Sequence, residues 1–181
     1  MTNTVALPSL EHDCNSCSGL CCVVLPFDAE QGFGFDKPAQ TACSHLRDDF
    51  LCGIHEALEP QGFRGCIHFT CHGAGQRVTR LFGETNWRSM PESAGEIFNM
   101  FKRLQKLHEL QFLLHTACSK LDNNDWQRRL TAQQHALEAL CQQAEQQNAV
   151  DLELATEQTM TLLRQLATEP AIVALRNRHN P

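Results

Sequence analysis

The sequence lacks the features that mark several broad protein classes. No apolar run approaches the ~18 residues that a membrane-spanning helix needs. Residues 1–5 have neither the basic start nor the apolar stretch of a secretory signal, so we expect a cytoplasmic protein with no membrane partner. Positive charge is scarce: six Lys and Arg residues face ten acidic residues before Ser89, and nine face eleven after it. This balance argues against duplex nucleic acid as the main partner.

Glycine and cysteine are both rare in the second half of the chain. Only one of the ten glycines follows Gly83, and only two of the ten cysteines follow Cys71. Because each interior glycine costs a helix up to ~1 kcal/mol, we expect loops, turns and short elements where glycine is frequent. The composition therefore predicts a tail at 1–13, a cysteine-cluster module at 14–88 and a helical region at 89–181.

Local patterns predict elements in both main parts. In the module, Cys22–Phe27 and Arg77–Phe82 have the apolar or alternating pattern of short strands. In the second part, Ser89-Met90-Pro91-Glu92 has the pattern of a capping box. Apolar residues at helical spacing then predict antiparallel helices over 91–119, about 126–144 and 150–168, with a last short helix over 171–176.

The cysteines have the spacing of metal ligands. The motif at Cys14, Cys17, Cys21 and Cys22 is C-x2-C-x3-C-C, and two thiolates separated by two residues can turn back onto one ion. Adjacent cysteines point in different directions, so one of the last pair is expected to serve a second metal or to be a spare thiol. The candidate ligands are Cys14, Cys17, Cys21, Cys22, Cys43, Cys52, Cys66 and Cys71.

The count of thiols leaves the kind of metal open. Eight thiolates are enough for two four-cysteine zinc sites, or for one 4Fe-4S cluster with thiols left over. A secreted disulfide framework is disfavoured by the missing signal and by the adjacent pair Cys21-Cys22. Buried structural thiols do not explain this density, and a redox pair at Cys14 and Cys17 leaves six cysteines unexplained. Cys118 and Cys141 lie on apolar helix faces, where core packing explains them.

At this point the sequence resembles a known family. The run Cys14…Cys17…Cys21-Cys22, followed by Cys43-Ser44-His45-Leu46, Cys52-Gly53-Ile54-His55 and Gly65-Cys66, resembles the YkgJ-type family, described as zinc- or iron-chelating CxxCxxxCC proteins. The stretch 49–76 is similar to a cysteine-rich module found in front of bacterial pentapeptide-repeat proteins. A more distant similarity is to flagellin lysine methylases, whose related cysteines are thought to hold an iron–sulfur cluster.

The resemblance covers about residues 14–88 and has two departures. Many family members have an aromatic residue where this chain has His55, and an Arg-Pro pair where it has Arg64-Gly65. Both changes leave the set of cysteines intact. The resemblance implies metal binding, and the biochemical roles of the family are mostly unassigned.

Three functions are consistent with these observations. We expect a structural or accessory metal-binding module, with a helical region that contacts a protein partner or a second copy. The alternatives are a metal-dependent or iron–sulfur enzyme or accessory factor in the modification of a protein or peptide, and metal storage or delivery. The enzyme alternative would use the polar groups near the cysteines, which are His45, His55, His68, His72, Asp48, Asp49, Glu56, Arg64 and Arg77.

The expected fold class combines the two parts. It is a small metal-stabilised irregular α+β cysteine-rich module, followed by an α-helical hairpin or three-helix bundle. In such a module the free energy of metal binding contributes directly to folding.

Overall fold

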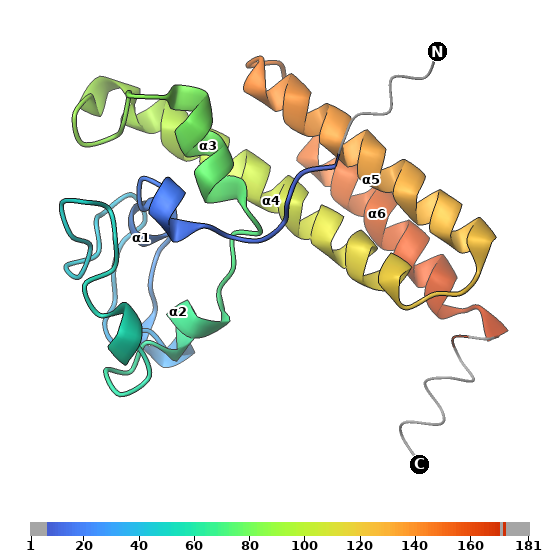
Figure 1. The fold of residues 1–181 in the computed structure, drawn as a ribbon, viewed down its shortest axis with the longest axis horizontal. Coiled ribbons are helices and arrows are strands. Elements are labelled where there is room, and N and C mark those ends of the chain that lie inside the picture. Colours follow the sequence, from blue (N-terminus) through green and yellow to red (C-terminus); the bar gives the residue numbers. More distant parts are fainter. Residues whose placement is uncertain (1–6, 171, 173–181) are drawn as a thin grey trace. The chain divides into compact units, whose positions relative to one another are not determined.

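The computed structural model describes residues 7–170 and 172, and every regular element in that part is helical (Figure 1). The α-helices are α1 (Leu20–Val24), α2 (Arg64–His68), α3 (Ala74–Phe82), α4 (Ala94–Ser119), α5 (Asn124–Glu145) and α6 (Leu152–Ala167). Short 3-10 helices lie at η1 (Cys14–Ser16), η2 (Ala29–Gln31), η3 (His55–Ala57) and η4 (Pro91–Ser93). The described residues contain no β-strand, so the prediction of an α+β module is wrong.

The first predicted strand, Cys22–Phe27, begins inside α1. Gly19 precedes this helix with φ +68°, a left-handed conformation that suits glycine and starts the turn. The buried side chains of α1 are Leu20, Val23 and Val24, which are spaced three and four residues apart and so lie on one helical face. Six residues are too few for an apolar run to distinguish this spacing from that of a buried strand.

The second predicted strand, Arg77–Phe82, lies within α3. Gly73, with φ +82°, starts this helix, and Ala74 and Val78 are buried four residues apart. The alternation that suggested a strand coincides with the helical spacing once Ala74 is included. Gly73 and Ala74, which precede the predicted strand, are therefore the residues that indicate the helix.

The helices after residue 89 begin and end near their predicted limits. The prediction of a capping box at Ser89 is wrong, because Met90 and not Ser89 stands at the N-cap position of η4. Before it, the Asn86 side chain accepts the backbone N–H groups of Arg88 and Ser89. Asn123 caps α5, and its side chain accepts hydrogen bonds from the backbone N–H groups of Asp125 and Trp126. Asp151 caps α6 in the same way, accepting from the N–H of Leu154. The predicted helix over 171–176 lies outside the described residues, apart from position 172.

The chain divides into two compact units, and the division falls inside α4. One unit is Ser9–His108, called here the cysteine unit, and the other is Glu109–Pro181 with Met1–Pro8, called the helical unit. In the helical unit, α5 and α6 pack side by side (Figure 1). Its buried apolar residues include Leu110, Leu114, Leu121, Trp126, Leu130, Leu137, Cys141, Ala144, Ala155 and Leu166.

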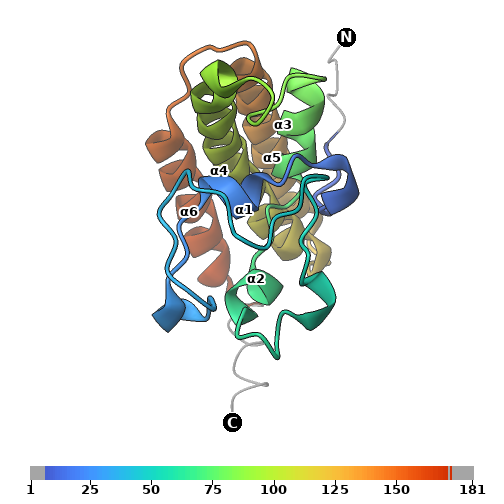
Figure 2. The ribbon, with the colours of Figure 1, turned by 90° about the vertical axis from the view of Figure 1, so that its left-hand side faces the viewer.

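The cysteine unit has two buried regions. Apolar side chains of α1, α3 and the first part of α4 are buried, with Leu20, Val78, Phe101 and Leu104 fully enclosed. A second cluster lies among the loops that Figure 2 shows around α1 and α2. This aromatic cluster consists of Phe27, Cys43, Leu46 and Phe63, with Cys22, Phe33, Phe35, Ile54, Leu58, Cys66 and Trp87 packed against it. Three cysteines thus belong to a small aromatic core.

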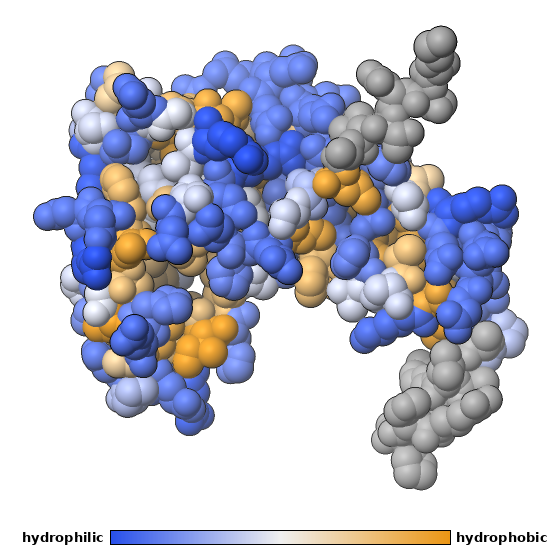
Figure 3. Space-filling model, in the orientation of Figure 1, coloured by the Kyte–Doolittle hydropathy of each residue, from blue (hydrophilic) through white to orange (hydrophobic). Residues whose placement is uncertain are grey.

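The surface of the described residues is mainly hydrophilic on the face drawn in Figure 3, with apolar residues in small patches. The large apolar side chains of the cysteine unit that are most exposed are Ile67, Leu81 and Met90. In the described part of the chain, no helix combines the length and the apolar character needed to cross a membrane.

Candidate metal centre

Four thiols gather around the start of α3. α3 packs against η1, which contains Cys14. A Cβ atom placed on Gly75, in the first turn of α3, would lie 2.7 Å from Cys17 Sγ and 3.6 Å from Cys71 Sγ, so both sulfurs face this turn. The pKa of Cys21 is raised by its contact with Cys22, by burial and by the charges of Cys17 and Cys71. We call Cys14, Cys17, Cys21 and Cys71 thiol set A.

The other four thiols gather at the aromatic cluster. The backbone N–H of Cys43 donates to the carbonyl of Cys22 over 3.0 Å. An isolated bridge pairs Leu46 with Cys52, which brings Cys52 to the turn that follows Cys43. Cys22, Cys43 and Cys66 all belong to the aromatic cluster. We call Cys22, Cys43, Cys52 and Cys66 thiol set B.

The two sets meet at the adjacent pair Cys21-Cys22, whose sulfurs lie 3.9 Å apart. The pKa of Cys22 is lowered because its sulfur accepts a hydrogen bond from Cys21, and the charge of Lys37 lowers it further. The proton of the pair therefore stays on Cys21.

Backbone N–H groups point at several of the sulfurs. The N–H of His45 donates to Cys43 Sγ over 3.4 Å. Burial raises the pKa of Cys17 and of Cys52, while backbone hydrogen bonds, from Leu20 and Gly19 to the former and from Ile54 to the latter, oppose that rise. Such donors stabilise a thiolate, which is the form that binds a metal.

Burial keeps most of the other thiols protonated in the absence of a metal. The pKa of Cys66 is raised to about 12, first by burial and then by the charges of Cys22, Cys52 and Cys43. Burial also raises the pKa values of Cys14 and Cys43, and neighbouring thiolates add to both shifts. A cation placed among these groups would reverse the repulsion between thiolates.

The thiols suit a soft metal in number and chemistry, but they do not already surround one. All ten cysteines are free. Within the described residues, no group of three or more His, Cys, Asp or Glu side chains is arranged to hold a metal ion as the side chains stand. A metal would therefore have to draw the thiols of a set together from these positions.

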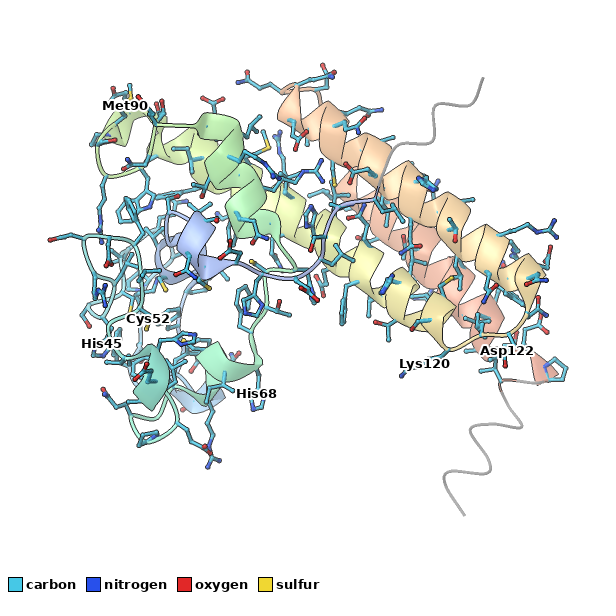
Figure 4. All side chains as sticks on the ribbon, viewed as in Figure 1. His45, Cys52, His68, Met90, Lys120 and Asp122 are labelled. Atoms are coloured by element: carbon cyan, nitrogen blue, oxygen red, sulfur yellow. The ribbon has the colours of Figure 1, made fainter. Side chains whose placement is uncertain are left out.

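The histidines predicted as supporting groups are scattered. The His45 ring packs against Phe35 and Phe63, with ring centroids 5.9 and 5.3 Å apart, and His72 is buried. His55 and His68 are exposed, and in Figure 4 His68, at the end of α2, lies away from Cys52 and His45.

The charged residues predicted as supporting groups mostly lie at the surface. Asp49 pairs with Arg47, and Asp48 lies 3.8 Å from Arg88. Glu56 and Arg64 are exposed, whereas Arg77 is buried. Asp48 and Asp49 thus form part of a solvated, ion-paired turn.

Two buried cationic or basic groups were missed by the sequence reasoning. Lys37 Nζ donates to the carbonyls of Leu25, Pro38 and Thr41 over 2.6, 3.2 and 2.8 Å, and lies 4.6 Å from the Phe27 ring centre. Burial lowers the pKa of Lys37, and the nearby thiolates of Cys43, Cys22 and Cys21 oppose that shift. No periodic or spacing signal distinguishes this lysine in the sequence.

The second missed group is His108 of α4. Its Nδ1 lies 2.7 Å from the carbonyl of His72, and its Nε2 lies 3.2 Å from Arg77 Nη1. Because a carbonyl only accepts and a guanidinium only donates, His108 carries its proton on Nδ1. This contact fixes the backbone next to Cys71, and a lone histidine on an apolar helix face gave no hint of it.

We predict that Lys37→Met destabilises the cysteine unit by about 1–3 kcal/mol, because it leaves three partly buried carbonyl hydrogen bonds without their donor. The exposed Lys120→Met is the matched control and should change the free energy of unfolding by less than about 0.5 kcal/mol. Urea unfolding followed by hydrogen exchange of peptides from 20–60 measures both. Equal stability of the two variants would contradict a stabilising role for the three hydrogen bonds of Lys37.

Part of this chain is similar to a curated bacterial protein. The chain is 44% identical over 111 residues to an uncharacterized protein, YybG, of Bacillus subtilis. The match covers 61% of this chain and 40% of the relative, so the chain spans less than half the length of that curated relative. No protein-family profile matches the chain. No solved structure matches it either.

Proposed function

We propose that the chain is a metal-binding protein that holds zinc, or alternatively a 4Fe-4S cluster, through the cysteines of sets A and B. The observation that carries this proposal is the grouping of eight free thiols from five separate stretches of chain, with backbone N–H groups aimed at their sulfurs. Soft all-sulfur donors favour zinc or iron–sulfur over hard cations. The YkgJ-type resemblance of residues 14–88 supports the same proposal.

The chemistry of the donors favours a structural or accessory role over catalysis. A catalytic zinc site keeps an open position, whereas four thiolates per ion fill all positions of a tetrahedral site. The metal would then organise loops whose aromatic core is small. We propose the helical unit for contact with a protein partner, a second copy of this chain included.

A cytoplasmic location belongs to the same proposal. Eight thiols close to one another remain reduced and available to a metal only in a reducing compartment. In an oxidising compartment, neighbours such as those of set A would be expected to form disulfides.

Metal analysis of protein purified without oxygen tests the proposal. Elemental analysis and an absorption spectrum should show bound zinc in a colourless protein, or iron in a brown one. The variant C14S/C17S/C43S/C52S should lose the metal, while the control C118S/C141S, which changes the two cysteines outside the cluster, should retain it. Wild-type protein that binds neither metal, as purified or after reconstitution, would refute the proposal.

Gly75→Ala should weaken metal binding at set A by at least about tenfold. The new methyl would lie 2.7 Å from Cys17 Sγ, closer than real Cβ contacts, and so would push this sulfur from the turn. Gly95→Ala is the control, because nothing lies within 4 Å of a Cβ at that position. Competition with a chromophoric chelator measures both affinities, and equal affinities would contradict this placement of Cys17.

Metal affinity should rise steeply with pH between 6 and 8. Burial raises the pKa values of Cys14, Cys17, Cys43, Cys52 and Cys66 above that of an ordinary cysteine thiol, so these thiols hold protons at neutral pH and must release them on binding. Four released protons per ion correspond to a slope of up to about four in log affinity per pH unit. Isothermal titration calorimetry in buffers of different ionisation enthalpy counts these protons, and a count near zero would contradict the prediction.

A further inference from the structure

We propose that sets A and B bind two separate ions, and that the adjacent residues Cys21 and Cys22 ligate different ones. This inference rests on the proposed function and adds to it the stoichiometry and the assignment of each ligand. It applies to an ion that takes four thiolates, as zinc does.

Set A has its own structural frame. Cys14 lies in η1, against which α3 packs, and Cys17 follows η1 directly. The carbonyl of Cys71 accepts the N–H of Ala74, the first residue of α3. The close approach that Gly75 allows then brings the sulfurs of Cys17 and Cys71 to the same turn. A residue with a side chain at this position would separate them.

Set B has a different frame, built from loops. The N–H of Cys43 donates to the carbonyl of Cys22, and the N–H of Gly53 donates to the carbonyl of His45 over 2.8 Å. These bonds hold three of the four cysteine-bearing segments together. Cys66 follows Gly65, whose N–H donates to the carbonyl of Gly32 over 2.7 Å and whose Cα lies against the Phe33 ring. The frame of set B is therefore built from backbone hydrogen bonds between loops, whereas that of set A is built on the first turn of α3.

The helix α1 separates the adjacent pair. Consecutive residues of an α-helix point about 100° apart around its axis, because 3.6 residues make one turn. Cys22 packs against the aromatic cluster with Cys43 and Cys66. Cys21 does not belong to that cluster, and it follows Leu20, the first residue of α1, whose backbone N–H donates to the sulfur of Cys17. Cys21 thus completes set A, and Cys22 completes set B.

Lys37 makes the two sites unequal. A zinc ion with four thiolates carries a net charge of −2, and the buried ammonium of Lys37 lies close enough to Cys43 and Cys22 of set B, and to Cys21 of set A, to interact with their charges. Its three carbonyl acceptors hold it in place. The charge of a metal-bound set B is therefore partly compensated within the protein.

Counting bound zinc in single-site variants tests the assignment. Wild-type protein reconstituted with zinc should bind two ions per chain in native mass spectrometry. Cys71→Ser in set A and Cys66→Ser in set B should each leave one ion, and the control Cys141→Ser, outside both sets, should keep two. Cys14→Ser and Cys52→Ser, at an exposed and a half-buried cysteine, repeat the test with milder changes.

Alkylation of the native variants identifies which thiols remain bound. In Cys71→Ser the set B cysteines should stay protected from iodoacetamide while those of set A react, and Cys66→Ser should show the reverse. One ion per wild-type chain, or loss of both ions in the set A variants, would overturn the two-site assignment and leave the proposed function standing. No bound ion in the wild type would overturn the proposed function itself.

Discussion

Complete removal of the metal is expected to unfold the cysteine unit and to leave the helical unit folded. A four-thiolate zinc site contributes on the order of 10 kcal/mol to the folded state, which is comparable with the whole stability of a small domain. The aromatic cluster contains four buried residues and sits among loops, so it cannot replace that contribution. The other buried region of the unit depends on α1 and α3, and helices of five and nine residues are too short to persist without the segments that the metal holds. The helical unit has its own buried leucines, including Leu114, Leu130 and Leu137.

Hydrogen exchange with mass spectrometry measures this effect in the full chain. After chelation under reducing conditions, amides of 14–88 should exchange rapidly, while those of α5 and α6 keep their protection. Zinc added back should restore the original pattern. Unchanged protection in 14–88 after verified loss of all metal would show that the metal does not hold this region together.

The second large effect is expected at Leu130 in the middle of α5. This side chain is fully buried, so Leu130→Ala should lower the free energy of unfolding of the helical unit by about 2–5 kcal/mol. Leu154→Ala in α6 removes the same atoms from a side chain that is 48% exposed, and it should cost less than about 1 kcal/mol.

The readout has to be specific to one unit, because two compact units need not unfold together. Urea-dependent hydrogen exchange of α5 peptides reports the helical unit alone. Metal content should be the same in both variants. If Leu130→Ala and Leu154→Ala were equally stable, or if Leu130→Ala released the metal, the division of the chain into these units would be wrong.

The long helices could be predicted from sequence because their pattern extends over many residues. The prediction over 91–119 corresponds to α4 at Ala94–Ser119, and that over 150–168 corresponds to α6 at Leu152–Ala167. At such lengths an apolar period of 3.6 residues cannot be mistaken for alternation. The capping box was wrong because Asn86 accepts the backbone N–H of Ser89, which the Glu92 side chain would accept in a capping box.

Short elements could not be assigned in the same way. α1 has five residues and α3 has nine, and in segments of this size helical and strand patterns overlap. The decisive residues are Gly19 and Gly73, whose left-handed backbone begins each helix. Their conformation depends on the surrounding chain and is not visible in the local pattern.

The candidate ligands could be predicted from sequence, but their grouping could not. The density and spacing of the cysteines predict eight candidate ligands, and their binding of a metal stays a prediction. Their division into sets depends on contacts between distant segments, such as the hydrogen bond from Cys43 to Cys22 and the approach of Cys71 to Gly75. The same is true of Lys37, whose three acceptors come from both sides of it in the chain.

X-ray absorption at the metal edge tests most directly whether these thiols share a cation. For the zinc form, the nearest neighbours should be four sulfur atoms at about 2.3 Å, with no nitrogen or oxygen among them. For the iron form, the nearest neighbours should likewise be sulfur only. A shell that contains nitrogen or oxygen in place of these sulfurs would mean that the clustered cysteines do not hold the ion.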